Sequence, residues 1–263
     1  MAGGKFVEVS EVSRRFRTPE GEVHALDSVS FDVRAGEFLS IVGPSGCGKS
    51  TLVMIIAGLM PPTGGVITIG GLVVDRPQTN LGIVFQSPVL LAWRSALGNV
   101  LLQLEMRGLD VSAHRARARA LLASVGLEGF ENRYPYELSG GMRQRVSICR
   151  ALIHDPSLLL MDEPFGALDA LTRDQMTLDI QRIWARGQKT VLFITHSITE
   201  AVFLSDRVLV MTPRPGRIDA TIEVDLPRPR RLALREDARF AAYTRQIYDR
   251  FMAHGVLRDI EVP

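Results

Sequence analysis

The octapeptide from Gly43 to Ser50 constrains the fold of this chain more than any other feature. It reads G-P-S-G-C-G-K-S, which fits the pattern G-x-x-x-x-G-K-[ST] at every fixed position. An apolar stretch, residues 38–42, precedes it, and a helix-permissive apolar run, residues 51–57, follows it. A strand, a glycine-rich loop and a helix in this order form a phosphate-binding loop. The alternative, a glycine-rich turn with an incidental lysine, leaves the agreement of so many positions unexplained.

The residue types in the loop match the needs of a bound triphosphate. Glycines let the backbone bend around phosphate oxygens, and the following helix directs free N–H groups and its positive dipole end at them. The ammonium group of Lys49 is expected between the β- and γ-phosphates, and the hydroxyl of Ser50 is expected to reach Mg²⁺. The predicted nucleotide contacts in this loop are Gly43, Pro44, Ser45, Gly46, Cys47, Gly48, Lys49, Ser50 and Thr51.

Composition sets the class of protein. A length of 263 residues permits one large domain, or a core with a smaller insert, and 46% hydrophobic with 23% charged residues is typical of a folded soluble protein. The net charge of +2 is too small to predict nucleic acid as the main partner. One dense basic stretch, residues 227–231, is expected to be a solvated linker rather than a contact for lipid or RNA.

Cysteine usage and hydropathy indicate the compartment. Of the two cysteines, Cys47 lies inside the phosphate loop, so a structural disulfide with Cys149 is not expected and a reducing compartment is favoured. The first six residues lack the apolar segment of a secretory signal. No apolar run approaches the roughly 18 residues that cross a bilayer. The chain is expected in the cytosol, where it can dock on a membrane protein.

The hydrophobic pattern changes twice along the chain. The first third is rich in apolar–polar alternation, residues from about 87 to 155 have helical patterns, and continuous apolar runs then return between helix-length segments. Strands that are apolar on both faces and alternate with helices indicate a parallel sheet covered on two sides, here interrupted by a helical insert. The predicted strands are residues 6–9, 29–33, 66–69, 81–85, 158–161, 191–194 and 208–211, and the predicted helices include residues 96–107 and 112–125.

Two carboxylates end one of the apolar strands. Asp162 and Glu163 directly follow L-L-L-M, and the carboxyl ends of parallel strands line the ligand crevice of such sheets. Asp162 is predicted to hold Mg²⁺ through a water, and Glu163 to orient and polarise the attacking water. Two acids that merely begin a loop are the alternative.

Residues 138–145, L-S-G-G-M-R-Q-R, decide the family. They resemble the signature sequence of the ATP-binding cassette (ABC) family. Physically they predict a second anion site, with Ser139 as helix N-cap and Gly140 and Gly141 permitting close approach. A capped core helix is the competing interpretation, because apolar side chains recur at spacings of four, three and four from Met142 to Ile153. Both interpretations can hold together, and Cys149 on that stripe is expected to be core packing.

The resemblance covers roughly residues 5–216 and assigns further roles. It implies that Gln86 senses Mg²⁺ and the hydrolytic water, that Asp169 belongs to an aspartate loop, and that His196 is the switch histidine. It also places Phe16 under the adenine ring, with core packing as the alternative. The implied fold is an α/β P-loop NTPase core with a parallel sheet, an N-terminal antiparallel β subdomain and an inserted α-helical subdomain. The expected divisions are residues 1–86, 87–157, 158–226 and a C-terminal linker and helix, 227–263.

The resemblance also implies partners and mechanism. Two cassettes are expected to pair head to tail around ATP and Mg²⁺, each nucleotide lying between the phosphate loop of one chain and Ser139, Gly140 and Gly141 of the other. Metal contacts are implied for Ser50, Gln86 and Asp162, and catalytic roles for Lys49, Gln86, Glu163 and His196. Closure then depends on the γ-phosphate, so that hydrolysis releases the dimer.

A single cassette without a fused membrane span resembles a bacterial importer subunit. Residues 91–96, L-A-W-R-S-A, and 211–218, M-T-P-R-P-G-R-I, are similar to the nitrate/sulfonate/taurine importer subfamily, although Ala92 stands where its members more usually have proline. This resemblance implies uptake of a small anion or organic acid through a separate permease, a periplasmic or lipoprotein substrate-binding protein as an indirect partner, and a peripheral position on the cytoplasmic face of the inner membrane. The alternatives are export or lipid trafficking, a non-transport ABC ATPase in translation or repair and, last, a P-loop kinase.

Three further expectations concern single features. Trp93 is either an anchor for a permease helix or packed within the helical insert, and the sequence leaves both open. A stripe of Phe240, Tyr243, Ile247 and Phe251 predicts one amphipathic helix packed on its own cassette rather than a membrane anchor. Because Cys47 lies near Lys49 and a helix start, its thiol pKa is expected to be lowered.

Overall fold

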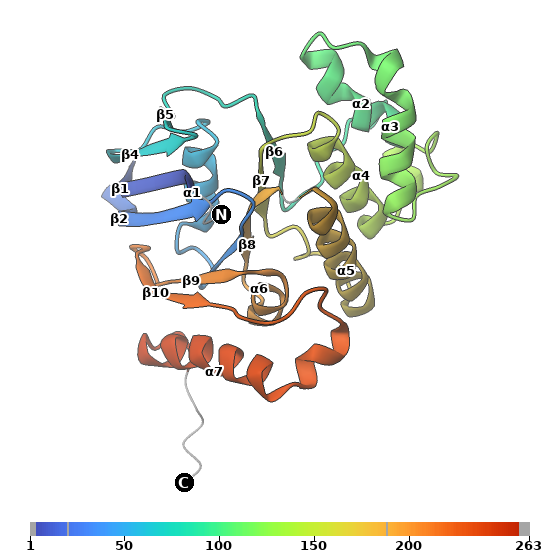
Figure 1. The fold of residues 1–263 in the computed structure, drawn as a ribbon. Helices are drawn as coiled ribbons and strands as arrows, with labels where there is room; N and C mark the ends of the chain where they lie inside the picture. Colours follow the sequence, from blue (N-terminus) through green and yellow to red (C-terminus); the bar gives the residue numbers. More distant parts are fainter. Residues whose placement is uncertain (1–3, 20, 188, 258–263) are drawn as a thin grey trace. The chain divides into compact units, whose positions relative to one another are not determined.

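The computed structural model describes residues 4–19, 21–187 and 189–257 (Figure 1). The expectation that no secretory signal is present concerns residues 1–6, of which Met1, Ala2 and Gly3 lie outside the described residues. The chain forms two compact units, the first made of residues 1–79 with 190–263, and the second of residues 80–189. The finer divisions predicted at residues 86, 157 and 226 stay predictions.

The first unit contains a four-stranded antiparallel sheet. Its strand order is β2 (Gly21–Arg34), β1 (Lys5–Thr18), β4 (Gly64–Ile69) and β5 (Leu72–Val73). The strands predicted at residues 6–9, 29–33 and 66–69 are confirmed, but β1 and β2 are much longer than the alternation indicates. Register shifts in the pairing of β1 with β2, for example between Val9 and Val12 of β1, interrupt the two-residue alternation of apolar and polar residues. The alternation in the sequence therefore ends before the strand does.

The same unit holds a second group of strands, three of which are buried on both faces. β3 (Phe38–Val42) pairs in parallel with β8 (Thr190–Thr195) and with β9 (Arg207–Met211), and β10 (Ile218–Glu223) is antiparallel to β9. Every residue of β3, β8 and β9 is buried, which confirms the continuous apolar runs as covered strands. β3 leads through the phosphate loop into helix α1 (Lys49–Ile56), and β8 leads into the short helix α6 (Ile198–Leu204).

The C-terminal helix α7 (Ala238–Ala253) follows a short 3₁₀ turn, η2 (Leu232–Glu236), and lies beside β10 (Figure 1). Phe240, Ile247 and Phe251 are buried, and the helix contacts α6 and β10. The predicted packing of this stripe on its own cassette is therefore confirmed. Among the described residues no helix is both long and apolar enough to cross a bilayer.

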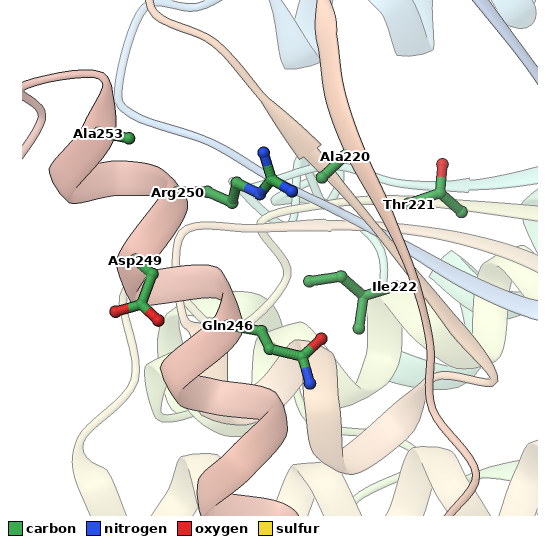
Figure 2. Close-up of a pocket in the computed structure, with 7 residues that line it drawn as sticks. All are labelled: Ala220, Thr221, Ile222, Gln246, Asp249, Arg250 and Ala253. Carbon is green, nitrogen blue, oxygen red and sulfur yellow. The ribbon is translucent and has the colours of Figure 1, made fainter.

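An open pocket of about 440 Å³ lies between parts of β10 and α7 (Figure 2). The side chains of Gln246 and Arg250 extend from the helix toward the strand. At one end of α7, His254 Nε2 lies 2.8 Å from Asp219 Oδ1 on β10. The seven lining residues include none of the predicted nucleotide contacts: they are Ala220, Thr221, Ile222, Gln246, Asp249, Arg250 and Ala253.

The prediction that the basic stretch at residues 227–231 is a solvated linker holds for Pro227, Pro229 and Arg231, which are exposed, but is wrong for Arg230. Arg230 is only 2% exposed, and its guanidinium donates to the carbonyls of Val202, Phe203 and Ser205 at the C-terminal end of α6. The last carbonyls of a helix have no partner within it, and a buried cation satisfies them while gaining from the negative dipole end. Burial lowers the pKa of the Arg230 guanidinium to about 10, so it stays charged at neutral pH.

The second unit combines a pair of parallel strands with helices. β6 (Leu81–Val84) pairs with β7 (Leu158–Asp162), and the helices are α2 (Ala96–Met106), α3 (Val111–Ser124), α4 (Gly140–Leu152) and α5 (Ala170–Gly187), with a 3₁₀ turn η1 (Pro135–Glu137) before α4. The predicted helices at 96–107 and 112–125 are confirmed. Apolar side chains of α2, α3 and α4 form one core, which includes Leu104, Leu122, Val146 and Cys149.

Candidate functional site

The phosphate loop of the first unit has a backbone that only glycine adopts readily. Gly46 and Gly48 have φ angles of +75° and +104°. A Cβ atom on Gly48 would lie 2.6 Å from Leu26 Cδ2 and 2.9 Å from the carbonyl oxygen of Ala25, whereas one on Gly46 would meet open space. Helix α1 begins at Lys49, and no side chain caps its N-terminus. The loop therefore ends at a helix start that no side chain caps, as an anion site requires.

Lys49 lies inside this loop rather than on the surface. Its side chain is largely buried, and Nζ donates to the carbonyl oxygens of Gly43 at 2.8 Å and Pro44 at 3.0 Å. A buried ammonium is costly unless it is paired. Carbonyl dipoles provide part of this compensation, and a phosphate oxygen would provide a full negative charge at the same place.

The expectation for Cys47 is wrong in sign. The thiol is 1% exposed, and burial raises its pKa above the ordinary value, although the nearby Lys49 ammonium acts in the opposite direction. The sequence indicated a neighbouring cation and a helix start, but it did not indicate that the folded loop buries Sγ away from solvent. Desolvation disfavours the thiolate more than the cation favours it. Cys149, by contrast, is core packing as predicted, with its thiol pKa raised to about 12 by burial.

Two other predicted residues belong to the first unit. Phe16 is partly exposed on β1, and the Arg14 guanidinium lies over its ring, 4.7 Å from the centroid. His196 is exposed directly after β8. The turn that carries it is held by a 2.6 Å hydrogen bond from Thr195 Oγ1 to Glu200 Oε2 and by Ser197, which caps α6. The roles of Phe16 and His196 toward a nucleotide stay predictions.

The acidic end of β7 lies in the second unit together with Gln86. Gln86 Nε2 donates to Glu163 Oε2 at 3.4 Å, so the structure brings two of the predicted catalytic side chains together. Glu163 follows Asp162 and has a φ angle of +46°, which a non-glycine residue rarely adopts. Such strain, of about 1–3 kcal/mol, persists where surrounding structure imposes it, and it is concentrated at functional sites.

The signature sequence begins α4 as predicted. Ser139 is the N-cap, its Oγ accepting from Met142 N at 3.2 Å, and Ser139 and Gly140 are exposed. A Cβ on Gly141 would lie 2.7 Å from Thr172 Cγ2, so this glycine allows α4 and α5 to approach. The buried stripe behind the helix start is also present, with Val146, Cys149 and Ile153 inaccessible to solvent. The interpretation as a capped core helix is therefore confirmed, and the predicted second anion site at its start stays a prediction.

Asp169 has a structural role that the sequence did not indicate. Its carboxylate accepts from Thr172 N at 3.0 Å and from Thr172 Oγ1 at 2.6 Å at the start of α5. These hydrogen bonds hold the pKa of the Asp169 carboxyl below its ordinary value. Its predicted contact with nucleotide stays a prediction.

Comparison with known proteins agrees with this geometry. Residues 26–166 match the family model described as ABC transporter. The chain belongs to the ABC transporter family. It is an ATPase subunit of that family with an α/β P-loop NTPase fold, which confirms the predicted family, fold class and enzyme class.

The relatives and structures similar to this ABC protein cover most of it. It is 53% identical over 217 residues to the taurine import ATP-binding protein TauB of Rhizobium johnstonii, covering 82% of each chain. It is 48% identical over 224 residues to an uncharacterized ABC transporter ATP-binding protein of Methanocaldococcus jannaschii, covering 85% of this chain and 84% of the relative. The dimeric structure of MJ0796, a bacterial ABC transporter cassette, matches with a TM-score of 0.76 and 32% identity over 84% of this chain and 100% of that one. A post-hydrolysis structure of the same cassette with ADP and Pi matches with a TM-score of 0.75.

Sequence reasoning missed the side chains that hold the functional loops of this ABC protein. Asn99 is inaccessible to solvent, and its amide bonds the loop before α2 at Leu91 N and at the carbonyls of Leu91, Arg94 and Ser95. An asparagine among apolar helix residues was the available signal. This loop presents Trp93, which is 74% exposed, so the interpretation of Trp93 as packed within the helical insert is wrong.

Proposed function

We propose that this chain hydrolyses ATP as one of two identical cassettes that drive import through a separate permease, and that the imported substrate is a small anion or organic acid of the sulfonate type. The observation that carries the proposal is that one chain holds two anion-directed elements. One is the glycine-rich loop around Lys49, and the other is the exposed N-terminus of α4 capped by Ser139. A P-loop kinase has no need of the second element.

In this proposal the phosphate loop and Lys49 bind the triphosphate, Phe16 contacts the base, and Ser139, Gly140 and Gly141 reach the nucleotide of a second copy. Glu163 polarises the attacking water, with Gln86 beside it. His196 and Asp169 complete the site. Backbone N–H groups from two helix starts provide fixed donors around the γ-phosphate without any proton transfer. The dimeric structure of the similar cassette MJ0796 supports the pairing.

The side chains present also fit Mg²⁺ bound together with phosphate. The proposed ligands Ser50, Gln86 and Asp162 all offer oxygen atoms, which Mg²⁺ prefers. The described residues contain no cluster of three or more His, Cys, Asp or Glu that would form a protein-only metal cage. Mg²⁺ characteristically keeps waters and uses few protein ligands beside phosphates, and when bound it would neutralise charge on the β- and γ-phosphates.

The permease side of the proposal depends on Trp93 and the loop around it. Trp93 is exposed, and Asn99 holds its loop with four hydrogen bonds to backbone groups. A rigid, exposed tryptophan is a common anchor at protein interfaces. Taurine import relatives at 46–53% identity support the substrate class and, with it, a peripheral position on the cytoplasmic membrane face and an indirect link to a substrate-binding protein.

Glu163→Gln tests the ATPase and the dimer together. The variant is expected to bind Mg²⁺–ATP, to hydrolyse it about 100-fold or more slowly, and to accumulate as a dimer in analytical ultracentrifugation, because the water is no longer polarised while the phosphate contacts remain. Glu128→Gln, at an exposed glutamate of the same unit, is the matched control. A Glu163→Gln variant that binds ATP but stays monomeric would contradict the paired site.

The transport class needs a membrane experiment. The tagged chain is purified from native membranes, and the permease that accompanies it is reconstituted with it in vesicles. Accumulation of radiolabelled taurine or nitrate against a gradient is expected to require ATP and this chain. Export of lipid by the vesicles would show that the chain belongs to an exporter. Recovery of the chain on ribosomes or DNA, without a permease, would show that it is a non-transport ATPase.

A further inference from the structure

The segment that carries Gln86 is an exposed loop between β6 and the region before α2. Gln86, Ser87 and Val89 are all exposed, so burial of these three side chains does not hold this part of the loop in place. Yet the Gln86 side chain reaches Glu163 Oε2. Some other interaction must therefore fix the backbone that presents it.

Helix α4 provides that interaction through two polar side chains. Gln144 Nε2 donates to the carbonyl of Phe85 at 3.2 Å, on the N-terminal side of Gln86. On the other side, Arg150 Nη2 donates to the carbonyl of Pro88 at 2.8 Å and Nη1 to the carbonyl of Val89 at 2.7 Å. The planar guanidinium thus bonds two consecutive carbonyls through two different nitrogens held in a fixed plane, whereas a lysine has a single nitrogen. The helix that starts with the signature sequence holds the Gln86 loop at both ends.

The backbone at Val89 is strained, which shows that the loop needs a restraint. Its φ angle is +44°, although valine is β-branched, and its side chain is 60% exposed. A β-branched residue in the left-handed region is a true outlier, and no buried packing compensates it here. The 2.7 Å hydrogen bond from Arg150 ends on the carbonyl of this same residue. This hydrogen bond therefore opposes a relaxation of Val89 toward negative φ, which would change the direction of the segment that contains Gln86 relative to the residues after Val89.

We propose that Arg150 is a positioning residue for hydrolysis: by bonding the carbonyls of Pro88 and Val89 it keeps Gln86 against Glu163. The inference rests on the proposed ATPase function, in which Gln86 and Glu163 act together. It assigns to the body of α4 a task distinct from that of the helix start, because Arg150 lies three turns beyond Ser139.

The test separates hydrolysis from binding in the purified chain. In Arg150→Met the Kd for Mg²⁺–ATP stays within about twofold, while single-turnover hydrolysis falls about tenfold or more, as for other losses of positioning. Arg117→Met is the matched control, because this arginine of the same unit makes a surface ion pair with Asp155, at 3.2 Å, and bonds no carbonyl of the Gln86 loop among the contacts of the described residues. Its hydrolysis rate is expected to stay at the wild-type value.

A second substitution, Val89→Gly, tests whether Arg150 acts by restraining the backbone at Val89. Glycine adopts a positive φ without strain, so in the double variant Arg150→Met/Val89→Gly the loop keeps its course without the arginine. Hydrolysis is expected to recover to within about threefold of Val89→Gly alone, a strong departure from additivity. Arg150→Lys, with and without Val89→Gly, gives the same comparison if Arg150→Met does not fold.

Three results would overturn the proposal. The first is wild-type hydrolysis in folded Arg150→Met, and the second is equal loss of hydrolysis and ATP binding. The third is no recovery on adding Val89→Gly while thermal unfolding is unchanged. A wild-type chain that binds ATP but never hydrolyses it would instead refute the proposed function itself.

Discussion

The phosphate loop and the region of the second unit that contains the Gln86 loop, Glu163 and helix α4 hold their functional groups by different means. In the first unit, Gly46 and Gly48 take positive φ angles at no steric cost, and Lys49 bonds the loop's own carbonyls. In the second unit, non-glycine residues take such angles at Glu163 and Val89, and side chains from other elements hold the loops. A loop built from its own backbone is rigid locally, whereas a loop held from outside can be released by one side chain.

The largest effect expected from this difference is at the loop's own cation. Lys49→Ala removes the ammonium that lies among the loop carbonyls, and ATP hydrolysis is expected to fall about 100-fold or more with weaker nucleotide binding. Lys189→Ala, which removes a lysine paired with Asp155 at 2.7 Å in the second unit, is the control. Normal steady-state hydrolysis in Lys49→Ala would place the nucleotide elsewhere.

A pair of glycine-to-alanine substitutions tests whether the two regions differ in how well they tolerate an added Cβ atom. Gly48→Ala meets Leu26 and the Ala25 carbonyl at a φ of +104°, so it is expected to weaken ATP binding at least tenfold and to cost about 1–3 kcal/mol of unfolding free energy. For Gly140→Ala the nearest atom is the flexible end of Arg143, 4.0 Å away, and its unfolding free energy should stay within about 0.5 kcal/mol. Denaturant titration and nucleotide binding measure both. Equal stability of the two variants would contradict the comparison.

The two cysteines report on the same regions. Burial raises both thiol pKa values, to about 12 for Cys149, so alkylation of the native protein should be slow and should accelerate as the pH rises. Cys47, in a ligand loop, is expected to react at least about tenfold faster than Cys149, whose reaction requires opening of the helical core. Mass spectrometry of labelled peptides measures this, with and without ATP. ATP should slow labelling of Cys47 only, and fast labelling of Cys149 would show that the second unit opens readily.

The smallest effect expected is a pH dependence confined to the second unit. Burial lowers the pKa of the His154 imidazole, whose Nε2 lies 3.2 Å from the carbonyl of Leu81, the residue that starts β6. The unfolded chain then binds a proton more readily than the folded one, so stability is present above the unfolded pKa of about 6.5 and is lost as the pH falls through the lower folded value. Denaturant midpoints of the wild type should fall between pH 7 and 5 more than those of His154→Gln. An unchanged slope in the variant would assign the titration to another group.

The features that depend only on neighbouring residues along the chain were predictable from the sequence. The phosphate loop, the buried strands and the N-cap at Ser139 each depend on residues within a few positions of one another, so a pattern identifies them. Arg230 was misjudged for the opposite reason. Its partners Val202, Phe203 and Ser205 lie more than twenty positions earlier in the chain. A run of arginines and prolines does not indicate that one arginine will donate hydrogen bonds to the last carbonyls of a distant helix.

The sequence by itself determined the family and the enzyme class, and it predicts the residues that meet the nucleotide, because the spacing of glycines, lysine and carboxylates along the chain is itself the pattern of a phosphate site. Only the tertiary structure decided that Cys47 is covered, that Trp93 is exposed, and that Arg150 bonds the carbonyls beside Gln86. Desolvation, exposure and hydrogen bonding between distant segments depend on what surrounds a side chain in space, and that information is absent from its neighbours along the chain.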